Sequence, residues 1–379
     1  MTDQSIDNTF LLKEMAEERK PPVATTGVLA WLRADLFSDA FSSFLTIASV
    51  LFVAWIVPDL VRYLFIDAVW DAKNGVPCRV PGTGACWGFI RENMPYFVYT
   101  SYPIDQRWRV DAALITGAVL VFWLLWPPAP RKGVAALLFF VVFPIVGFWL
   151  ISGAPWLGLP KVDTNLWGGV FVSLIVATIG IVFSLPVGVL LALGRRSDLP
   201  LVKFFSVVFI EFVRGVPFIT VLFMANTMLP LFVPDWLTPD RLARPLIATA
   251  LFASAYMAEI VRGGLQAMPK GQYEGAMALG LPYWKMMRLV VLPQALTTVI
   301  PGIVNTFIGL FKDTTLVAIV GTFDFLKAIE TRRLDAEWAG PTISTTGYVF
   351  AAMFYFVFCF GMARYSLYME RKLSAGRRH

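Results

Sequence analysis

Long apolar runs separated by short polar segments repeat along most of the chain. A helix needs about 20 apolar residues to cross the hydrocarbon layer of a bilayer. Runs that approach or exceed this length cover residues 40–57 with an extension towards 66, 112–126, 133–151, 166–194, 204–234, 246–258, 289–311 and 339–363. The pattern therefore predicts an all-α polytopic membrane protein with about eight transmembrane helices.

The polar segments between the runs predict an orientation, because Lys and Arg in short loops favour the cytoplasmic side. These residues fall on one side of the membrane if the N-terminus is cytoplasmic: Arg131, Lys132, Arg195, Arg196, Lys203, Lys270, Lys285, Arg288, Arg371, Lys372, Arg377 and Arg378. Residues 1–39 and 370–379 are then cytoplasmic tails. The long connection 67–110 is placed outside.

Composition supports a membrane protein and limits the kinds of catalytic and ligand-binding site that the chain can form. Hydrophobic residues make up 57% of the chain and charged residues 15%, far from the balance of a soluble domain. The net charge of +6 reflects cytoplasmic membrane edges, so we do not infer nucleic-acid binding. The single histidine is His379, which leaves no cluster for a metal and no His-based triad. The chain has no GxxxxGK[ST] phosphate loop, so any ATP and Mg must bind to another subunit.

The chain separates by composition into two parts. Up to about residue 158 it is rich in Trp, much of it at the ends of apolar runs, where aromatic rings favour the membrane interface. Beyond residue 166, ionisable pairs recur within apolar runs. We therefore predict extra N-terminal helices over 40–158 and a transport core over 159–369. No internal repeat is evident, which weakens the case for a secondary carrier built from repeated halves.

The three cysteines are scattered. Cys78 and Cys86 share the predicted outer loop, where an oxidising exterior would let them form a disulfide. Two unrelated thiols are the alternative, because two cysteines in one loop are weak evidence. Cys359 lies within the last apolar run and is expected to be a small packing residue.

Two ionisable pairs in the apolar runs have the spacing that brings side chains together on one helix face. These are Glu211 with Arg214 and Glu259 with Arg262. Charges in lipid need a partner or water, so both pairs are candidates for a substrate pathway. The alternative is that they neutralise each other at helix ends on the cytoplasmic interface.

A third constellation, Lys312-Asp313-Thr314, follows an uncharged run and precedes a further apolar segment, 316–323. A break in the helix at this point would line a cavity, and interrupted apolar segments are where transporters bind substrates. The adjacent cation and anion suit a zwitterion such as an amino acid. Simple anchoring at the interface is the alternative.

A polar interruption over residues 256–293 divides the apolar C-terminal half. Pro269 suits a first helical position, Gly280 suits the left-handed residue after a helix end, and Pro282 can start a second helix. The segment therefore predicts a helix, a sharp turn and a helix. Gly275, Ala276 and Ala278 leave the first helix with a nearly bare surface, which favours docking of another protein over catalysis.

This interruption resembles the EAA motif of the permease subunits of bacterial binding-protein-dependent ABC importers, which reads EAA, three residues, G, nine residues and I-x-L-P. Here the motif reads Glu274-Gly275-Ala276, Gly280 and Val290-Val291-Leu292-Pro293. Gly275 replaces the first Ala and Val290 the Ile. Further stretches resemble the polar-amino-acid subfamily of these permeases: 211–217, 255–264, 271–272 and 312–314.

The resemblance implies a five-helix permease core at the C-terminal side, with the EAA helix entering a groove on an ATPase. The residues expected to couple to the ATPase are Glu274, Gly275, Ala276, Gly280, Leu281 and Pro293. The implied partners are an ATPase dimer, a second homologous permease and a periplasmic amino-acid-binding protein. The implied location is the bacterial inner membrane. The N-terminal layout further resembles the M-type permease of the general L-amino-acid importers of alpha-proteobacteria.

Two other classes of protein compete with this interpretation. An autonomous secondary carrier or channel has no need of a small-residue helix, turn and helix between two spans. A membrane scaffold without transport activity would leave the intramembrane charges without a use.

Overall fold

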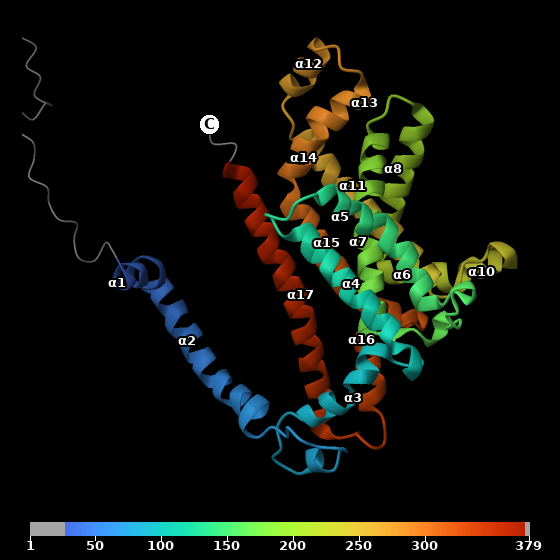
Figure 1. The fold of residues 1–379 in the computed structure, drawn as a ribbon. Coiled ribbons are helices and arrows are strands. Elements are labelled where there is room, and N and C mark those ends of the chain that lie inside the picture. Colours follow the sequence, from blue (N-terminus) through green and yellow to red (C-terminus); the bar gives the residue numbers. More distant parts are fainter. Residues whose placement is uncertain (1–26, 376–379) are drawn as a thin grey trace, which may run out of the picture. The chain divides into compact units, whose positions relative to one another are not determined.

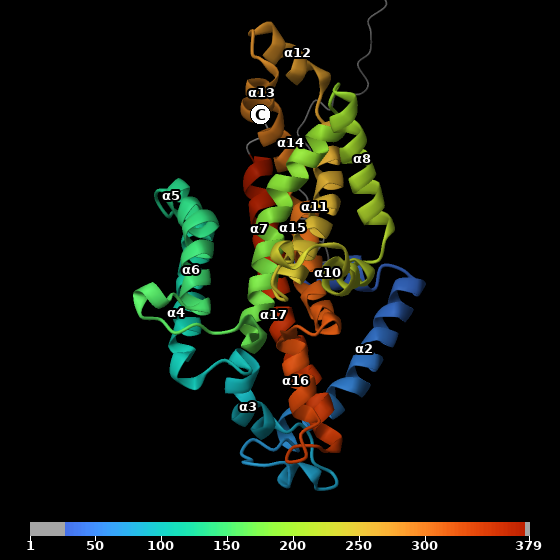
Figure 2. The same cartoon turned by 90° about the vertical axis from the view of Figure 1, so that its right-hand side faces the viewer.

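The computed structural model describes residues 27–375 of the chain (Figure 1 and Figure 2). The chain divides into two compact units, residues 1–68 and 69–379. The described part of the first unit consists mainly of α1 (Val28–Trp31) and α2 (Ala40–Val61). No side chain of α2 is buried, as expected for a helix surrounded by lipid.

The second unit is helical apart from two very short strands. Its α-helices are α3 (Trp87–Tyr99), α4 (Arg107–Leu125), α5 (Lys132–Leu137), α6 (Phe143–Ser152), α7 (Val170–Arg195), α8 (Pro200–Gly215), α9 (Phe218–Phe223), α10 (Leu229–Phe232), α11 (Ala243–Gln266), α12 (Lys270–Ala278), α13 (Tyr283–Met286), α14 (Leu292–Thr298), α15 (Ile300–Asp313), α16 (Phe325–Arg333) and α17 (Pro341–Ala375). The strands β1 (Gly168–Gly169) and β2 (Phe323–Asp324) pair in parallel, with Gly168 opposite Phe323.

Shorter helical turns extend or join these helices. Turns with π-helical hydrogen bonding are Leu32–Leu36, Arg62–Ile66, Leu138–Val142, Met224–Met228 and Met287–Val291. Turns with 3-10 hydrogen bonding are Pro77–Arg79, Ile104–Gln106, Pro155–Leu157, Thr164–Leu166, Asp235–Leu237 and Thr314–Val320.

The described residues contain seven helices that are long and apolar enough to cross a membrane. These are Ala40–Ile66, Ile104–Leu125, Lys132–Ser152, Val170–Arg195, Ala243–Gln266, Ile300–Val320 and Pro341–Leu373. An eighth is obtained if the bent pair Pro200–Gly215 and Phe218–Phe232 counts as one span. The predicted all-α class with about eight spans is confirmed.

The bent pair turns by 108°. Val216, between α8 and α9, is extended with φ −108° and ψ 136°, and Pro217 follows it. A proline disfavours helical backbone at the residue before it, so the chain cannot continue as one straight helix. The apolar run predicted over 204–234 is therefore a sharp bend.

One predicted span is wrong in its position. The run 289–311 is not a continuous helix, because α14 ends at Thr298 and α15 begins at Ile300. Pro301 has no N–H to donate to the preceding turn, which interrupts the helical hydrogen bonding. The span in the structure is instead Ile300–Val320. Lys312 and Asp313 consequently lie within it and not at its end.

The pair of α7 and α11 forms the centre of the second unit, where the two helices lie side by side (Figure 1). Gly188 allows their close approach, since a Cβ there would lie 2.7 Å from the Cβ of Met257. Small residues at helix contacts are the usual way for membrane helices to gain van der Waals packing.

Residues 69–158, which belong to the predicted extra N-terminal part, pack against the predicted transport core. Phe89 and Phe97 of α3 share a buried cluster with Phe325 of α16 and Ile343 of α17. The predicted outer loop 67–110 thus contains a helix of its own. The compact unit begins at Val69, well before the predicted boundary at residue 159.

Cys78 and Cys86 form a disulfide, with their Cα atoms 5.7 Å apart, and both are fully buried. The neighbouring Arg79 fixes this loop to the connection between α16 and α17. Its guanidinium donates to the carbonyls of Ala336, Glu337 and Ala339 at 2.8, 3.0 and 2.8 Å.

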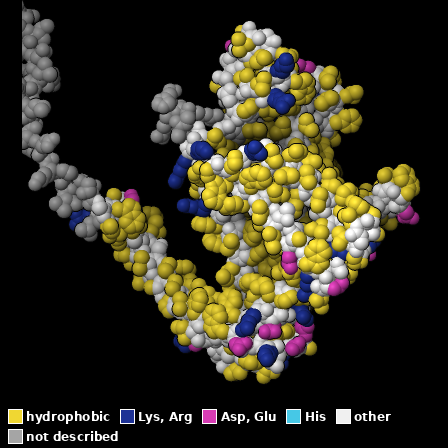
Figure 3. Space-filling model, viewed as in Figure 1, with side chains coloured by type: hydrophobic (Ala, Val, Ile, Leu, Met, Phe, Trp, Pro, Cys, Tyr) yellow, Lys and Arg dark blue, Asp and Glu magenta, His cyan; other side chains and the backbone are white. Residues whose placement is uncertain are grey.

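Charged side chains gather at the two ends of the second unit in the view of Figure 3, and apolar side chains cover the face between them. Lys and Arg predominate at the end that carries α12, whereas both signs of charge occur around α3. This distribution is typical of a protein whose middle faces lipid.

Candidate functional site

The polar segment after α11 folds as the predicted helix, turn and helix. Gly280 has φ +70°, in the left-handed region. Its N–H donates to the Met277 carbonyl at 2.9 Å, and the Leu281 N–H donates to the Ala276 carbonyl at 3.2 Å. These are the two bonds of a Schellman motif, which satisfies the last carbonyls of a helix. The predicted conformation of Gly280 is confirmed.

The two prolines of this segment precede their helices instead of occupying the first helical position. Pro269 has ψ 138° and Pro282 has ψ 156°, both extended. The first helix therefore begins at Lys270, one residue later than predicted. The fixed φ of proline is compatible with either position, so sequence alone does not decide between them.

The predicted docking surface of α12 is exposed except at one residue, Ala276. Glu274, Gly275 and Gly280 are exposed, as a docking surface requires. Ala276 is only 3% exposed and packs into the chain's own core, with the partly buried Leu281 beside that core. Ala276 therefore positions α12 and does not offer a surface to a partner.

Pro293, the last residue of the motif, is exposed and is the second residue of α14. A hydrogen bond joins this helix to α12, from Gln294 Nε2 to Gln272 Oε1 at 2.9 Å. The two ends of the motif are thus connected through side chains as well as through the turn.

Four of the predicted pathway residues gather with Arg195 into one group, which we call the Glu259 cluster. Arg262 donates to Glu259 Oε1 at 2.6 Å through Nε and again through Nη2. The other oxygen, Oε2, lies 3.5 Å from both Arg195 Nη1 and Arg214 Nη1. Arg195 Nη1 also lies 2.7 Å from Glu211 Oε1. The cluster therefore joins α7, α8 and α11.

The pairing within the cluster is only partly as predicted. The pair of Glu259 and Arg262 is confirmed. Glu211 and Arg214 do not pair with each other among the ion pairs of the described residues; Glu211 contacts Arg195 and Arg214 contacts Glu259. Helical spacing brings two side chains near each other, but a partner from a neighbouring helix can still replace one of them. The contribution of Arg195 was missed, because its place at the end of an apolar run indicated only orientation.

Every charged group of the Glu259 cluster has a partner within it, and the Glu259 side chain is only 19% exposed. Removing one member of a partly buried network leaves another charge unpaired, which is costly. The geometry thus favours a structural role, in which the ion pairs hold three helices together, over a substrate-binding site.

Lys312, Asp313 and Thr314 lie where α15 changes to the 3-10 turn Thr314–Val320. The helix changes type here without the break that we predicted. Lys312 is exposed, Asp313 is half-buried and Thr314 is buried, its hydroxyl donating to the Phe311 carbonyl at 2.8 Å. Over residues 27–375, neither Lys312 nor Asp313 forms an ion pair with the Glu259 cluster.

Asp324 is a buried carboxyl that sequence reasoning missed. It lies between two spans and caps α16, accepting from the N–H groups of Leu326 and Lys327 at 3.0 Å each. Burial raises its pKa to about 7, because the loss of hydration outweighs these two bonds. An Asp directly before the first apolar residues of a helix, here Phe325 and Leu326, is a known N-cap signal, so the capping rule predicts it.

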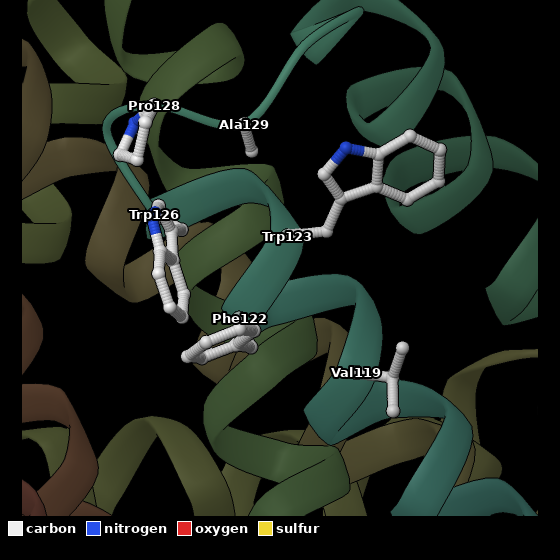
Figure 4. A pocket seen from close by; sticks show the side chains of 6 residues that line it. All are labelled: Val119, Phe122, Trp123, Trp126, Pro128 and Ala129. Atoms are coloured by element: carbon white, nitrogen blue, oxygen red, sulfur yellow. The ribbon is translucent and has the colours of Figure 1, made fainter.

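An open apolar groove of about 340 Å³ lies at the end of α4 (Figure 4). Its lining consists of Val119, Phe122, Trp123, Trp126, Pro128 and Ala129. None of the predicted site residues borders it, and its aromatic rings fit a position at the membrane interface. Within residues 27–375, no group of three or more His, Cys, Asp and Glu side chains could hold a metal ion.

Two comparisons of the sequence with known proteins agree on one family. The sequence profile of the binding-protein-dependent transport system inner membrane component matches residues 184–375. The chain is 48% identical to the inner membrane amino-acid ABC transporter permease protein YhdY of Escherichia coli (strain K12), over 92% of this chain and 94% of YhdY.

A second relative of full length is the glutamate/glutamine/aspartate/asparagine transport system permease protein BztC of Rhodobacter capsulatus. It is 42% identical and aligns with 98% of this chain and 100% of BztC. Among solved structures, the crystal structure of an amino acid ABC transporter with histidines matches with 26% identity and a TM-score of 0.47. That match covers 54% of this chain and 92% of the other.

Proposed function

The chain belongs to the family of inner membrane components of binding-protein-dependent transport systems, and from this membership we propose that it is the permease subunit of an ATP-driven amino-acid importer. The observation that carries the proposal is the exposed α12 with its Gly280 turn, placed between two spans. An autonomous secondary carrier, the alternative class, has no use for such an element.

The proposed complex contains an ATPase dimer, a second homologous permease and a periplasmic amino-acid-binding protein. The chain has no phosphate loop, so ATP and Mg bind on the ATPase subunits. The exposed Glu274, Gly275 and Gly280 form the docking surface for one ATPase. The name of BztC suggests glutamate, glutamine, aspartate and asparagine as the first amino acids to test.

The orientation that we propose places α12 in the cytoplasm and α3 with the Cys78–Cys86 disulfide outside the inner membrane. Both termini are then cytoplasmic. The excess of Lys and Arg at the α12 end of the second unit supports this direction (Figure 3).

We assign different roles to the two groups of charged residues. Lys312, Asp313 and Thr314 lie within the span Ile300–Val320 and belong to the candidate pathway. Charged side chains inside a span are costly and mark substrate pathways, and here the half-buried Asp313 lies next to Lys312 in sequence. The Glu259 cluster, whose charges are mutually paired, ties α7, α8 and α11 together.

The test is uptake of radiolabelled glutamate and glutamine into proteoliposomes that hold the chain with its proposed partners. We expect uptake to require internal ATP and the binding protein, and to stop when the ATPase is inactivated by mutation. Uptake by the chain alone, driven by an ion gradient, would establish a secondary carrier instead.

A further inference from the structure

Two adjacent arginines at the end of α7 contact different neighbours. Arg195 is the last residue of α7 and Arg196 caps the helix. Consecutive residues of a helix point about 100° apart, so the two side chains reach different elements. Arg195 joins the Glu259 cluster, through Glu259 of α11 and Glu211 of α8.

Arg196 contacts α12, the proposed docking helix. Its Nη1 donates to the Tyr273 hydroxyl at 3.1 Å and to the Leu265 carbonyl at 3.2 Å. The Tyr273 hydroxyl in turn donates to the same carbonyl at 3.2 Å. The Arg196 guanidinium also lies 5.6 Å from the centre of the Tyr273 ring, within the range of a cation–π interaction. These contacts connect α7, α11 and α12 at one point.

The planar guanidinium of Arg196 is suited to this geometry, because it presents several N–H groups in a fixed arrangement. Tyr273 also packs beside the core cluster that holds Ala276 and Leu265. One face of α12 is therefore fixed to the end of α7, while Glu274 and Gly275 remain exposed.

Along the chain, α12 follows the span α11 after residues 267–269, but its route to the next span is less direct. It passes through α14 and then through the break at Val299, where φ is −107° and ψ is 12°. A rigid displacement of α12 would have to cross this break before reaching α15. The contact through Arg196 reaches the long helix α7 without any such interruption.

We propose that Arg196 transmits displacement of α12 to the end of α7 through Tyr273, where the neighbouring Arg195 joins α7 to α8 and α11 through Glu211 and Glu259. The proposal rests on the proposed function only in taking α12 as the helix on which the ATPase acts. Arg196 is a positioning residue in this role, since it acts through Tyr273. Transmission through a physical contact is a coupling between sites, and mutation of the contact measures it.

The experiment uses the complete importer in proteoliposomes, with L-glutamate and L-glutamine as probes. The variants are Arg196→Gln, Arg196→Lys, Tyr273→Phe and the double variant Arg196→Gln/Tyr273→Phe. Lys203→Gln, which changes an exposed basic residue of α8, is the matched control. The measurements are the ATPase co-purified per permease, the rate of ATP hydrolysis and the amino-acid uptake.

We expect Arg196→Gln to lower uptake per ATP hydrolysed about fivefold, the effect of losing roughly one hydrogen bond's net contribution. Arg196→Lys should recover part of the loss, and Tyr273→Phe should have a smaller effect because it keeps the ring. The loss in the double variant should be smaller than the sum of the two single losses, because both single changes remove the bond between Arg196 and Tyr273. The co-purified ATPase and the control variant should stay at the wild-type level.

Wild-type uptake per ATP in Arg196→Gln overturns the proposal. A fall in uptake that only follows the loss of co-purified ATPase also overturns it, because damaged docking or folding would explain that result. If the wild-type importer takes up neither probe nor any other amino acid tested, the proposed function fails, and hydrogen exchange then tests the contact between Arg196 and Tyr273. Nucleotide-dependent changes of exchange in α7 and α11 that persist in Arg196→Gln then overturn the proposal, and their loss supports it.

Discussion

At the scale of single residues, the turn after α12 depends on Gly280. Its φ of +70° is a conformation that costs a residue with a side chain about 1–2 kcal/mol. A Cβ added there would meet no atom within 4 Å, so the whole cost comes from the backbone. The turn direction, and with it the angle of α12, is therefore set by the absence of one side chain.

Gly280→Ala is expected to reduce both the ATPase co-purified with the permease and the uptake, while the chain still inserts into the membrane. Gly361→Ala is the matched control, because a Cβ at Gly361 in α17 also meets nothing within 4 Å but the backbone is helical. Quantitative co-purification from membranes checks the prediction. Equal effects of the two variants would contradict it.

The buried Asp324 predicts a pH dependence of stability. Its pKa is about 7 in the folded chain against an ordinary value of 3.8, so the folded state keeps a proton that the unfolded state releases. The contribution of the Asp324 carboxyl to the free energy of unfolding is therefore fully present below pH 3.8 and is lost as the pH rises towards 7. The shift corresponds to about 4 kcal/mol at most.

Asp324→Asn should flatten the change in melting temperature between pH 5 and pH 8, because an amide does not titrate; its single oxygen replaces only one of the two carboxylate oxygens that accept from Leu326 and Lys327. Asp235→Asn, at an exposed carboxylate, is the control. Thermal unfolding in detergent at several pH values gives the slope of melting temperature against pH for each variant. The explanation fails if Asp324→Asn retains the wild-type slope.

At the scale of elements, the apolar pattern predicted most spans because their length and composition are properties of continuous sequence. It misplaced the span 289–311, since hydropathy does not register the missing N–H of Pro301. The pairing of Glu211 with Arg214 was predicted from one helix alone, and Arg195 from a neighbouring helix replaced it. The burial of Ala276 likewise depends on residues distant in sequence. Local rules predicted the turn at Gly280, but not these tertiary contacts.

The loop closed by the Cys78–Cys86 disulfide is expected to stabilise the folded chain by a measurable amount. Cys78 and Cys86 are eight residues apart in sequence, and closing a loop of that size stabilises a chain by roughly 2–3 kcal/mol in the chain-entropy account. Cys78→Ser/Cys86→Ser should therefore lower the melting temperature of the purified protein. Mass spectrometry of non-reduced peptides checks the bond directly, and Cys359→Ser is the control. An unchanged melting temperature would contradict a stabilising role.

At the scale of the whole molecule, composition divided the chain near residue 158, whereas the folded second unit begins at Val69. The reason is tertiary: Arg79 bonds carbonyls more than 250 residues away in sequence, and α3 packs on α16 and α17. No local pattern carries that information. The loop that holds Arg79 is consequently part of the same compact unit as the candidate pathway, so changes in it can affect transport as well as folding.

The candidate pathway gives the last prediction. Lys312 and Asp313 lie inside the span Ile300–Val320, and neither has an ion-pair partner in the Glu259 cluster. Lys312→Gln and Asp313→Asn should each lower amino-acid uptake per assembled complex by about tenfold, the scale expected for losing one hydrogen bond to a charged group. Uptake of several amino acids in proteoliposomes, normalised to the amount of complex, measures this.

Lys203→Gln and Asp235→Asn are the controls for this prediction, because they remove the same charges at exposed positions. Normalisation also separates the two roles that the sequence left open for Lys312 and Asp313. An interfacial anchor would change how much complex reaches the membrane and leave uptake per complex intact, whereas a pathway residue changes uptake per complex. Unchanged uptake per complex in both variants, for every amino acid tested, would remove these two residues from the pathway.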